Sequence, residues 1–168
     1  MDSPTTVAEA LRDGLRRLAK AVVVITCRHG GQRYAMAATA VSELSMDPPS
    51  LLICVNRSAS LFAPLSEGAD FCVNILHSDH SEISTACSGK KKGEARFAFG
   101  NWGGVPDGCP VLADAQASFL CRNDKAFDYG THHIVIGQVE EVAVNGSVSP
   151  LIYVDGRYAR IGNPLDLV

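Results

Sequence analysis

The 168-residue sequence lacks the features of several large classes of protein. Basic residues are not in excess: 15 Lys and Arg stand against 18 Asp and Glu, which gives a net charge of −3. A protein that binds mainly nucleic acid needs clustered Lys and Arg to neutralise phosphates, so we expect no nucleic-acid partner. No segment approaches the roughly 18 apolar residues of a membrane span, and the N-terminus has no uninterrupted apolar core of a secretory signal. We therefore expect a cytoplasmic protein with no membrane partner.

Paired metal ligands are also missing. No C-x-x-C pair occurs, and a zinc site needs such paired spacing. His77-x-x-His80 is not part of an H-E-x-x-H motif, so we interpret these two as surface histidines and predict no metal. In a reducing compartment the cysteines are most simply small buried hydrophobic residues; they are Cys27, Cys54, Cys72, Cys87, Cys109 and Cys121.

Three common catalytic or nucleotide-binding motifs are absent. No G-x-G-x-x-G opens a helix after a strand, no G-x-x-x-x-G-K-[ST] exists, and no serine lies in G-x-S-x-G. These absences leave the usual dinucleotide-binding, phosphate-loop and serine-hydrolase interpretations without support.

Composition and periodicity favour one globular domain over residues 1–168. Hydrophobic residues make up 46% and charged residues 20%, as in soluble proteins. A helix is predicted at about residues 6–19. It begins with the capping-box pattern Thr6-x-x-Glu9 and has one apolar face, formed by Val7, Ala10, Leu11, Leu15 and Leu18.

The rest of the chain, about residues 21–162, reads mainly as short strands. Strands are predicted at residues 21–27, 51–56, 71–76, 115–121 and 132–144, with hairpins at "RHGGQRY" and "YVDGRYARI". Short helices are expected before Gly68 and at residues 81–87. Because strands and helices do not alternate regularly, the pattern predicts an antiparallel β-barrel with peripheral helices and not a doubly wound sheet.

Small hydroxyl and amide groups gather on three turns of this predicted barrel. Together they could line a pocket for a ligand that is polar at its edge and anionic at one end. The basic run 90–92 is either a solvated loop or an anchor for such an anion. The polar groups are Thr39, Ser42 and Ser45, then Asn56, Ser58 and Ser60, and then Ser88, Gly89 and Lys90.

The sequence resembles the short-chain flavin reductase family over about residues 10–162. The resemblance lies in "YAMAATAVSELSMDPPSLLICVNRSAS", "FCVNIL", "SGKKKGEARF", "GCPVL", "GTHHIVIGQVEEV" and "PLIYVDGRYARI", in this order. It implies an FMN-binding split β-barrel of the Greek-key type and a homodimer whose second subunit helps to close the flavin groove. It also implies a reductase that supplies reduced flavin to a partner monooxygenase.

The resemblance assigns roles to particular residues. The segment 37–45 resembles the part that surrounds the isoalloxazine edge, and an N-R-x-x-S turn together with Lys90 matches the part that holds the ribityl chain and phosphate. Gly130-Thr131-His132 matches the segment that holds the nicotinamide, where His132 lies beside the flavin as the catalytic candidate; His133 is expected on the opposite side of the strand. The cofactor-binding candidates are Ala37, Ala38, Thr39, Ser42, Leu44, Ser45, Asn56, Arg57, Ser58, Ser60, Ser88, Gly89 and Lys90.

Three positions depart from the family pattern. Ala37 stands where threonine is common, Glu43 where serine is common, and Cys87 where phenylalanine is frequent. A lost hydroxyl and an added carboxylate are expected to weaken the binding of an anionic cofactor, unless Glu43 turns to solvent. At Cys87, looser packing beside the flavin is expected.

The predicted function is transfer of a hydride from NADH or NADPH to FMN or FAD. The adenylate half of FAD can stay outside a split-barrel groove, and a 2′-phosphate of NADPH needs a basic residue such as Arg33, Arg122 or Arg157. The alternatives are a flavin-binding sensor or carrier without turnover, a reductase that retains its flavin and reduces another acceptor such as a corrinoid, and a barrel of the pyridoxine-phosphate oxidase type. The last requires a basic phosphate cluster that the sequence does not display.

Overall fold

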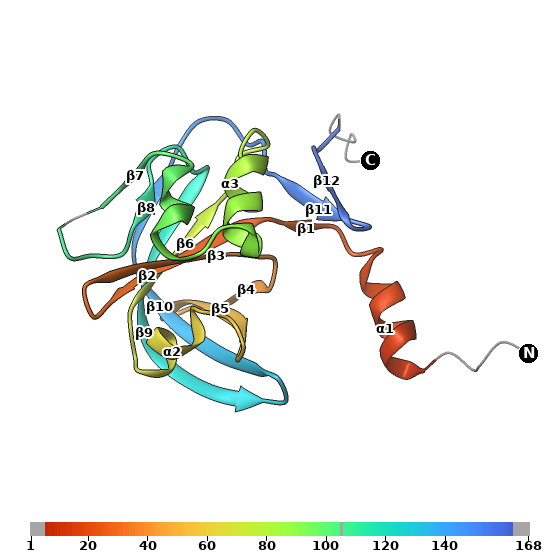
Figure 1. The fold of residues 1–168 in the computed structure, drawn as a ribbon, viewed down its shortest axis with the longest axis horizontal. Helices are drawn as coiled ribbons and strands as arrows, with labels where there is room; N and C mark the ends of the chain where they lie inside the picture. The colour runs from red at the N-terminus through yellow and green to blue at the C-terminus, as the bar shows by residue number, and fades with distance from the viewer. Residues whose placement is uncertain (1–5, 105, 163–168) are drawn as a thin grey trace, which may run out of the picture.

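β-Strands are the commonest regular element in the computed structural model, which describes residues 6–104 and 106–162 (Figure 1). Seven strands make one antiparallel sheet in the order β3-β2-β6-β9-β10-β5-β4. They are β2 (Val23–His29), β3 (Gln32–Ala38), β4 (Val41–Met46), β5 (Pro49–Asn56), β6 (Phe71–Ile75), β9 (Ala117–Tyr129) and β10 (His132–Val144). The antiparallel β fold class predicted from the sequence is confirmed.

The two edge strands of this sheet are consecutive in the chain. β3 ends at Ala38 and β4 begins at Val41, so two residues, Thr39 and Ala40, join the opposite edges. Two residues cannot cross the width of a flat seven-stranded sheet, so the sheet must curl until its edges approach each other. Within residues 6–104 and 106–162, no ladder of hydrogen bonds joins β3 to β4. The result is a barrel with a split between these strands.

Strand β2 is buried on both of its faces, which explains its continuous apolar sequence. Val23, Ile25 and Cys27 point into the barrel, where they pack with residues such as Ile53, Val55, Phe71 and Val135. Val22 and Val24 belong to a second cluster outside the barrel, together with Leu76, Ile83, Phe97, Leu112 and Leu151. Burial of this apolar area on two sides is the main stabilising contribution to the fold.

Strands β9 and β10 form a long hairpin that is packed at one end and exposed at the other. Gly137 lies at a register shift of this pair, after Ile136. A Cβ atom at Gly137 would lie 2.8 Å from Cβ of Cys121 and even closer to the ring of Phe71, so the position requires glycine. Toward the turn, Phe127 and Tyr129 are exposed.

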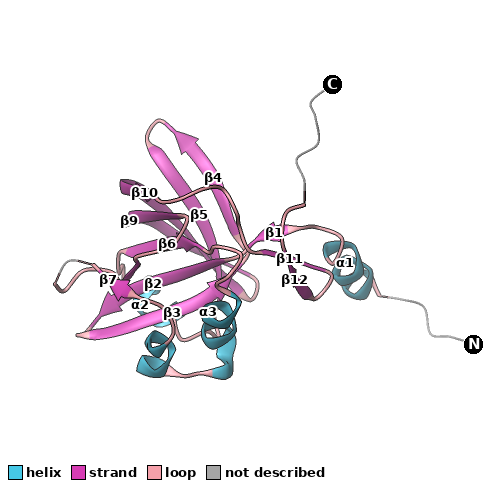
Figure 2. Cartoon of the chain, turned by 90° about the horizontal axis from the view of Figure 1, so that it is seen from above, coloured by secondary structure: helices cyan, strands magenta, loops and turns pink. Residues whose placement is uncertain are grey.

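Helical segments pack against the barrel in two places, one on the interior cluster and one on the outer cluster. Helix α2 (Phe62–Ser66) follows β5, and α3 (Ser81–Thr85) continues into a π-helical turn, η1 (Ala86–Lys90), and a 3-10 helix, η2 (Gly93–Ala98). Figures 1 and 2 both show α3 beside β3. A short two-stranded sheet, β7 (Trp102–Gly103) with β8 (Val111–Leu112), lies next in the chain. No helix in the described part of the chain is long and apolar enough to cross a membrane.

The N-terminal helix α1 (Val7–Leu15) projects from the barrel and buries none of its side chains (Figures 1 and 2). Its predicted capping box is present: the Thr6 hydroxyl accepts from the Glu9 backbone N–H, and the Glu9 carboxylate accepts from that of Thr6. The predicted end near residue 19 is wrong, because the chain leaves the helix to pair Lys20 with Tyr153. This pairing forms a small sheet of β1 (Lys20–Ala21), β11 (Ile152–Val154) and β12 (Arg157–Ala159).

Other sequence-based expectations also differ from the structure. β9 was expected to end at Cys121 but runs to Tyr129, because pairing with β10 continues through a segment whose exposed residues have no apolar alternation. β4 and the 3-10 helix η2 were not predicted. The hairpin turns at Gly30-Gly31 and Asp155-Gly156 are confirmed, and Gly30, Gly31, Asp155 and Gly156 all adopt positive φ.

Candidate functional site

Five of the candidate residues line one cavity of about 540 Å³ at the edge of the barrel, here called the rim cavity. Strand β3, the turn after β5 and the helical turns η1 and η2 supply its walls. Its lining residues are Met36, Ala37, Ser58, Ala59, Ser60, Cys87, Ser88, Gly89, Lys92, Gly93 and Arg96. The structure thus brings together Ala37, Ser58, Ser60, Ser88 and Gly89 from three separate parts of the sequence.

Hydrogen bonds within the chain shape the turn after β5. The side-chain oxygen of Asn56 accepts from the backbone N–H of Ser58 at 2.9 Å and from its hydroxyl at 2.8 Å. The backbone N–H of Ala59 donates to the Asn56 carbonyl at 2.9 Å. This side-chain-to-backbone pattern is typical of an Asx turn, in which asparagine replaces a backbone acceptor. It holds the hydroxyls of Ser58 and Ser60 at the cavity.

Arg96 is a cavity residue that the sequence-based candidates missed. Its Nε donates to the Lys91 carbonyl at 2.9 Å, and its Nη1 donates to the Ser60 hydroxyl at 3.1 Å and to the Ala35 carbonyl. A guanidinium has five N–H donors, and the bonds within the described residues come from Nε and Nη1, so Nη2 has capacity for a ligand. The fragment "SGKKKGEARF" contained Arg96, but the periodicity of a short 3-10 helix does not reveal which cation faces a cavity.

A smaller cavity of about 290 Å³ continues from the rim cavity along β3. Ala37 and Ser88 line both cavities, and Ala38 and Thr39 line the smaller one together with Tyr153 and Tyr158 of the small sheet. The Tyr158 hydroxyl donates to Ser84 Oγ at 2.9 Å. The candidates Ala37, Ala38 and Thr39 therefore lie along one continuous surface.

The adjacent histidines have opposite environments at the start of β10. His132 is exposed, and its Nδ1 lies 3.0 Å from the Thr131 hydroxyl. His133 is only 6% exposed; its Nδ1 lies 2.7 Å from a carboxylate oxygen of Asp128, and its ring packs edge-on against Phe62. His133 thus packs within the protein, while His132 is free to meet a ligand.

His132 is linked to the turn after β5 by strand pairing. It pairs with Asn56 across β10 and β5, and the backbone N–H of Arg57 donates to the Thr131 carbonyl at 3.0 Å. The candidates Gly130, Thr131 and His132 therefore lie beside Asn56 and Arg57, one turn from the serines of the rim cavity. They do not line the rim cavity in this single chain.

Four other candidates lie outside the rim cavity. Leu44 is 48% exposed on β4, and the Ser45 hydroxyl donates to the Asp47 carbonyl. Lys90 lines a separate cavity of about 290 Å³ beside Phe99 and Tyr158. Ser42 lines a larger cavity of about 640 Å³.

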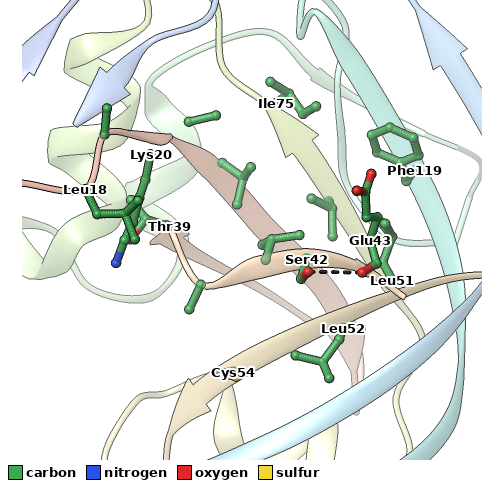
Figure 3. A pocket seen from close by; sticks show the side chains of 16 residues that line it. Leu18, Lys20, Thr39, Ser42, Glu43, Leu51, Leu52, Cys54, Ile75 and Phe119 are labelled. Atoms are coloured by element: carbon green, nitrogen blue, oxygen red, sulfur yellow. Dashed lines mark hydrogen bonds between the residues drawn. The ribbon is translucent and has the colours of Figure 1, made fainter. Parts of the chain in front are cut away.

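A cavity of about 640 Å³, larger than the rim cavity, lies beside the connection at Thr39 and Ala40 (Figure 3). It is mainly apolar, with Leu18, Leu51, Leu52, Ile75 and Phe119 among its lining residues. Lys20, Thr39, Ser42 and Glu43 are its polar neighbours, and the Ser42 hydroxyl donates to the Glu43 carbonyl at 3.0 Å. We call this the split cavity; it reaches the base of the arm that carries α1.

The three departures from the family pattern have different settings. Ala37 lines the rim cavity, so the absence of a threonine hydroxyl removes a potential donor there. Cys87 also lines that cavity but is 1% exposed, and burial raises the pKa of its thiol to about 11, so it contributes a neutral, apolar wall. Glu43 is exposed and lines the split cavity, away from the rim cavity.

The three arginines considered for binding a 2′-phosphate also differ in their surroundings. Arg122 forms ion pairs with Asp124 and Glu140, and Arg157 pairs with Asp155. Arg33 lines a cavity that adjoins the rim cavity, and its partner is Glu94. Among the described residues, no group of three or more His, Cys, Asp and Glu could hold a metal ion.

The rim cavity has the donor set that a flavin phosphate and ribityl chain require. The Ser60 hydroxyl, the Nη2 of Arg96 and the ammonium of Lys92 are donors that suit a phosphate and polyol. The Ser58 and Ser88 hydroxyls donate within the protein and keep acceptor capacity for the ribityl hydroxyls, and Met36, Ala37 and Ala59 supply apolar surface for a ring. Gly89 has φ of 102°, and a Cβ atom at this position would meet no other atom within 4 Å, so the backbone there is open to a ligand. The residues present therefore fit a flavin mononucleotide group.

Comparison with known proteins agrees with this chemistry. Residues 15–162 match the model of the flavin reductase like domain. FMN reductase (NADH) RutF of Agrobacterium fabrum is 39% identical over 160 residues, which cover 94% of this chain and 92% of that protein. The reductase component of an FADH2-dependent resorcinol hydroxylase from Rhizobium sp. is 40% identical over 158 residues, 93% of this chain and 88% of that protein.

Solved structures show the same fold. BorF, the flavin reductase component of a bacterial two-component tryptophan halogenase, superimposes with a TM-score of 0.84 at 26% identity, over 94% of this chain and 99% of that one. The family match spans nearly the whole described chain, including the rim cavity, the split and the Gly130-Thr131-His132 turn. The chain belongs to the family of flavin reductase like domains.

Proposed function

We propose that the protein is an NAD(P)H:flavin oxidoreductase that transfers a hydride from a nicotinamide to FMN or FAD. The observation that carries the proposal is the rim cavity, where serine hydroxyls, an oriented arginine and an apolar floor meet in a chain of this family. The exposed His132 lies at the neighbouring turn, paired with Asn56. Two relatives are named for FMN reduction by NADH and for supply of a hydroxylase, which supports NADH as the donor and a monooxygenase as the partner.

The bound flavin supplies the acceptor for the hydride, so the protein's work is binding and orientation. Ser58, Ser60 and Arg96 hold the phosphate and ribityl chain, and the wall that includes Ala37 and Cys87 excludes water from one side of the ring. Hydride transfer needs no general acid or base from the chain. It needs the two rings at about 3–3.5 Å, a distance that the binding residues must enforce.

His132 has the role of orienting the nicotinamide. When the Thr131 hydroxyl donates to Nδ1 of His132, the neutral ring carries its proton on Nε2, which can then donate to the carboxamide or a phosphate of NADH. His133 and Asp128 steady the beginning of the same strand through their 2.7 Å contact.

A homodimer completes the site in this proposal. The apolar stripe of α1 is uncovered in the single chain, with Val7 87% and Leu11 60% exposed, and the split cavity opens beside the arm that carries it. An uncovered apolar stripe of this kind usually marks an interaction surface. A second copy that covers α1 is expected to enclose the flavin groove as well.

The experiment that tests the function is anaerobic addition of NADH to the purified protein with FMN, and separately with FAD. Loss of the oxidised-flavin absorbance band should be much faster than with flavin and NADH alone. A bound flavin that is not bleached would contradict the proposal and favour a sensor or carrier. Gel filtration of the reduced mixture then separates a released flavin, suited to a monooxygenase, from a retained one that serves another acceptor.

The variant His132→Ala tests the proposed orienting role. The rate of flavin reduction by NADH should fall about 10–100-fold, because misplacement of the nicotinamide is costly, while the affinity for oxidised flavin stays nearly unchanged. Stopped-flow absorbance and a fluorescence titration give the two quantities. A large loss of flavin binding would contradict this role for His132.

A further inference from the structure

A second polar cavity adjoins the rim cavity and is not needed to hold FMN. Its volume is about 530 Å³, close to the 540 Å³ of the rim cavity. The two share Ser60, Gly93 and Arg96, so they are contiguous at the point where the rim cavity presents its phosphate donors. We call it the arginine cavity, since Arg28, Arg33 and Arg96 all line it.

The charge of the arginine cavity is suited to an anion. Its three guanidinium groups face one lining carboxylate, that of Glu94. Arg28 donates from Nε to the Gly108 carbonyl at 3.1 Å, which orients the group and leaves its Nη donors without a bond among the described residues. Guanidinium groups bind phosphate oxygens with two parallel hydrogen bonds, so this cavity has the chemistry of a phosphate site.

Arg33 is held in place by two contacts. Its guanidinium lies 4.2 Å from the centre of the Phe97 ring, and it forms an ion pair with the Glu94 carboxylate. The Arg33 side chain is 29% exposed, whereas Glu94 is 66% exposed and lies on the open side of the pair. An incoming phosphate can therefore displace Glu94 from Arg33 without disturbing the packing on Phe97.

We propose that the arginine cavity binds the adenosine-monophosphate half of FAD, so that the protein takes FAD through contacts that FMN does not make. The inference rests on the proposed function, which puts the flavin and its first phosphate in the rim cavity. In FAD the second phosphate is bonded to the first, so it must lie close to Ser60 and Arg96, where the arginine cavity begins. Arg33 and Arg28 then hold the second phosphate, and the negative charge of Glu94 weakens its binding.

Equilibrium titrations of FMN and FAD test this inference without turnover. We expect Arg33→Gln to weaken FAD binding about tenfold while FMN binding changes less than about twofold, because one charged phosphate contact is lost. Glu94→Gln should act in the opposite direction and tighten FAD binding, because the competing carboxylate is removed. Arg160→Gln, a matched loss of one exposed arginine outside the cavity, should change neither affinity.

Competition with ADP gives a second measurement on the unmodified protein. ADP should weaken the apparent affinity for FAD more than that for FMN, and Arg33→Gln should remove this difference. Equal losses of FMN and FAD affinity in Arg33→Gln would overturn the inference, because Arg33 would then belong to the site of the shared phosphate. Unchanged FAD binding in both Arg33→Gln and Glu94→Gln would overturn it as well.

The failure of the inference is distinguishable from failure of the proposed function. If neither flavin binds the unmodified protein, the proposed function fails and the inference fails with it. If both flavins bind and are reduced by NADH but the FAD-to-FMN affinity ratio does not respond to residues 33 and 94, the function stands and the inference alone is overturned. Thermal melting of each variant verifies that it is folded, and the charge-conserving Arg33→Lys should retain part of the FAD preference.

Discussion

The wall of the barrel and the rim cavity both contain small polar side chains, but these differ in what they bind. In the wall, Asn74 is completely buried and fully engaged: its amide nitrogen donates to the Val24 carbonyl, and its oxygen accepts from the Leu112 backbone N–H and the Ser118 hydroxyl. At the rim, Ser60 and Arg96 are accessible and keep donors for a ligand. Polar groups whose bonds are all made within the protein support the fold, whereas those with spare capacity support binding.

The largest expected effect comes from breaking the buried network in the wall. Asn74→Leu leaves the Leu112 N–H and the Ser118 hydroxyl without an acceptor, and each such loss costs about 1–3 kcal/mol. We expect the free energy of unfolding to fall by about 2–5 kcal/mol in urea denaturation. Adding Ser118→Ala to Asn74→Leu should cost less than the sum of the two changes, because one stranded donor is then absent. Unfolding energies that simply add would mean that these side chains are independent.

A smaller effect is expected from the buried thiols at alkaline pH. Burial raises the pKa of Cys27 and of Cys121 from 9.0 to about 12. Because the folded pKa is raised, the unfolded chain ionises first, so this stability is full below pH 9.0 and is lost as the pH rises toward 12. We expect a loss of about 1 kcal/mol per thiol for each pH unit in this window.

Urea midpoints measured at neutral pH and at several alkaline values check the thiol prediction. The variant Cys27→Val should show a shallower alkaline decline than the unmodified protein, since one buried thiol is removed. Identical declines in the two proteins would contradict a role for Cys27 in the pH dependence.

The smallest effect on stability is expected at the rim. Ser58→Ala should change the free energy of unfolding by less than about 0.5 kcal/mol, because the residue is exposed. Flavin affinity should nevertheless fall several-fold, because a hydroxyl of the rim cavity is lost. Ser66→Ala, which removes a hydroxyl from the exposed end of α2, is the matched control for fluorescence titration. Equal flavin affinities in the two variants would remove Ser58 from the binding site.

The difference between buried and exposed segments also explains which elements could be predicted from the sequence. β10 was expected at residues 132–144 and has these bounds, because one of its faces is buried and period-2 alternation records that burial. The second half of β9, up to Tyr129, is exposed on both faces and carries no such pattern. The apolar spacing of α1 continues through Leu18, but the helix ends earlier because Lys20 pairs with Tyr153. The spacing within one segment cannot reveal a strand partner more than 130 residues away.

The candidate site was predictable in part, through the resemblance to a family. The resemblance to flavin reductases is confirmed by the family match, and it supplied turns whose serines meet in the rim cavity. Arg96 and the arginine cavity were missed, because their geometry depends on how η2 packs against β3. The roles given to Leu44, Ser45 and Lys90, which do not line the rim cavity, stay predictions.

The two-residue connection at Thr39 and Ala40 also limits how the molecule can move. The three Cα-to-Cα steps from Ala38 to Val41 span at most about 11 Å, since each step across a trans peptide is about 3.8 Å. The edges of the split are therefore tethered at this point, and they can separate widely only toward the far ends of β3 and β4. Any separation of the two edges is therefore smallest beside Thr39 and Ala40 and increases with distance from this connection.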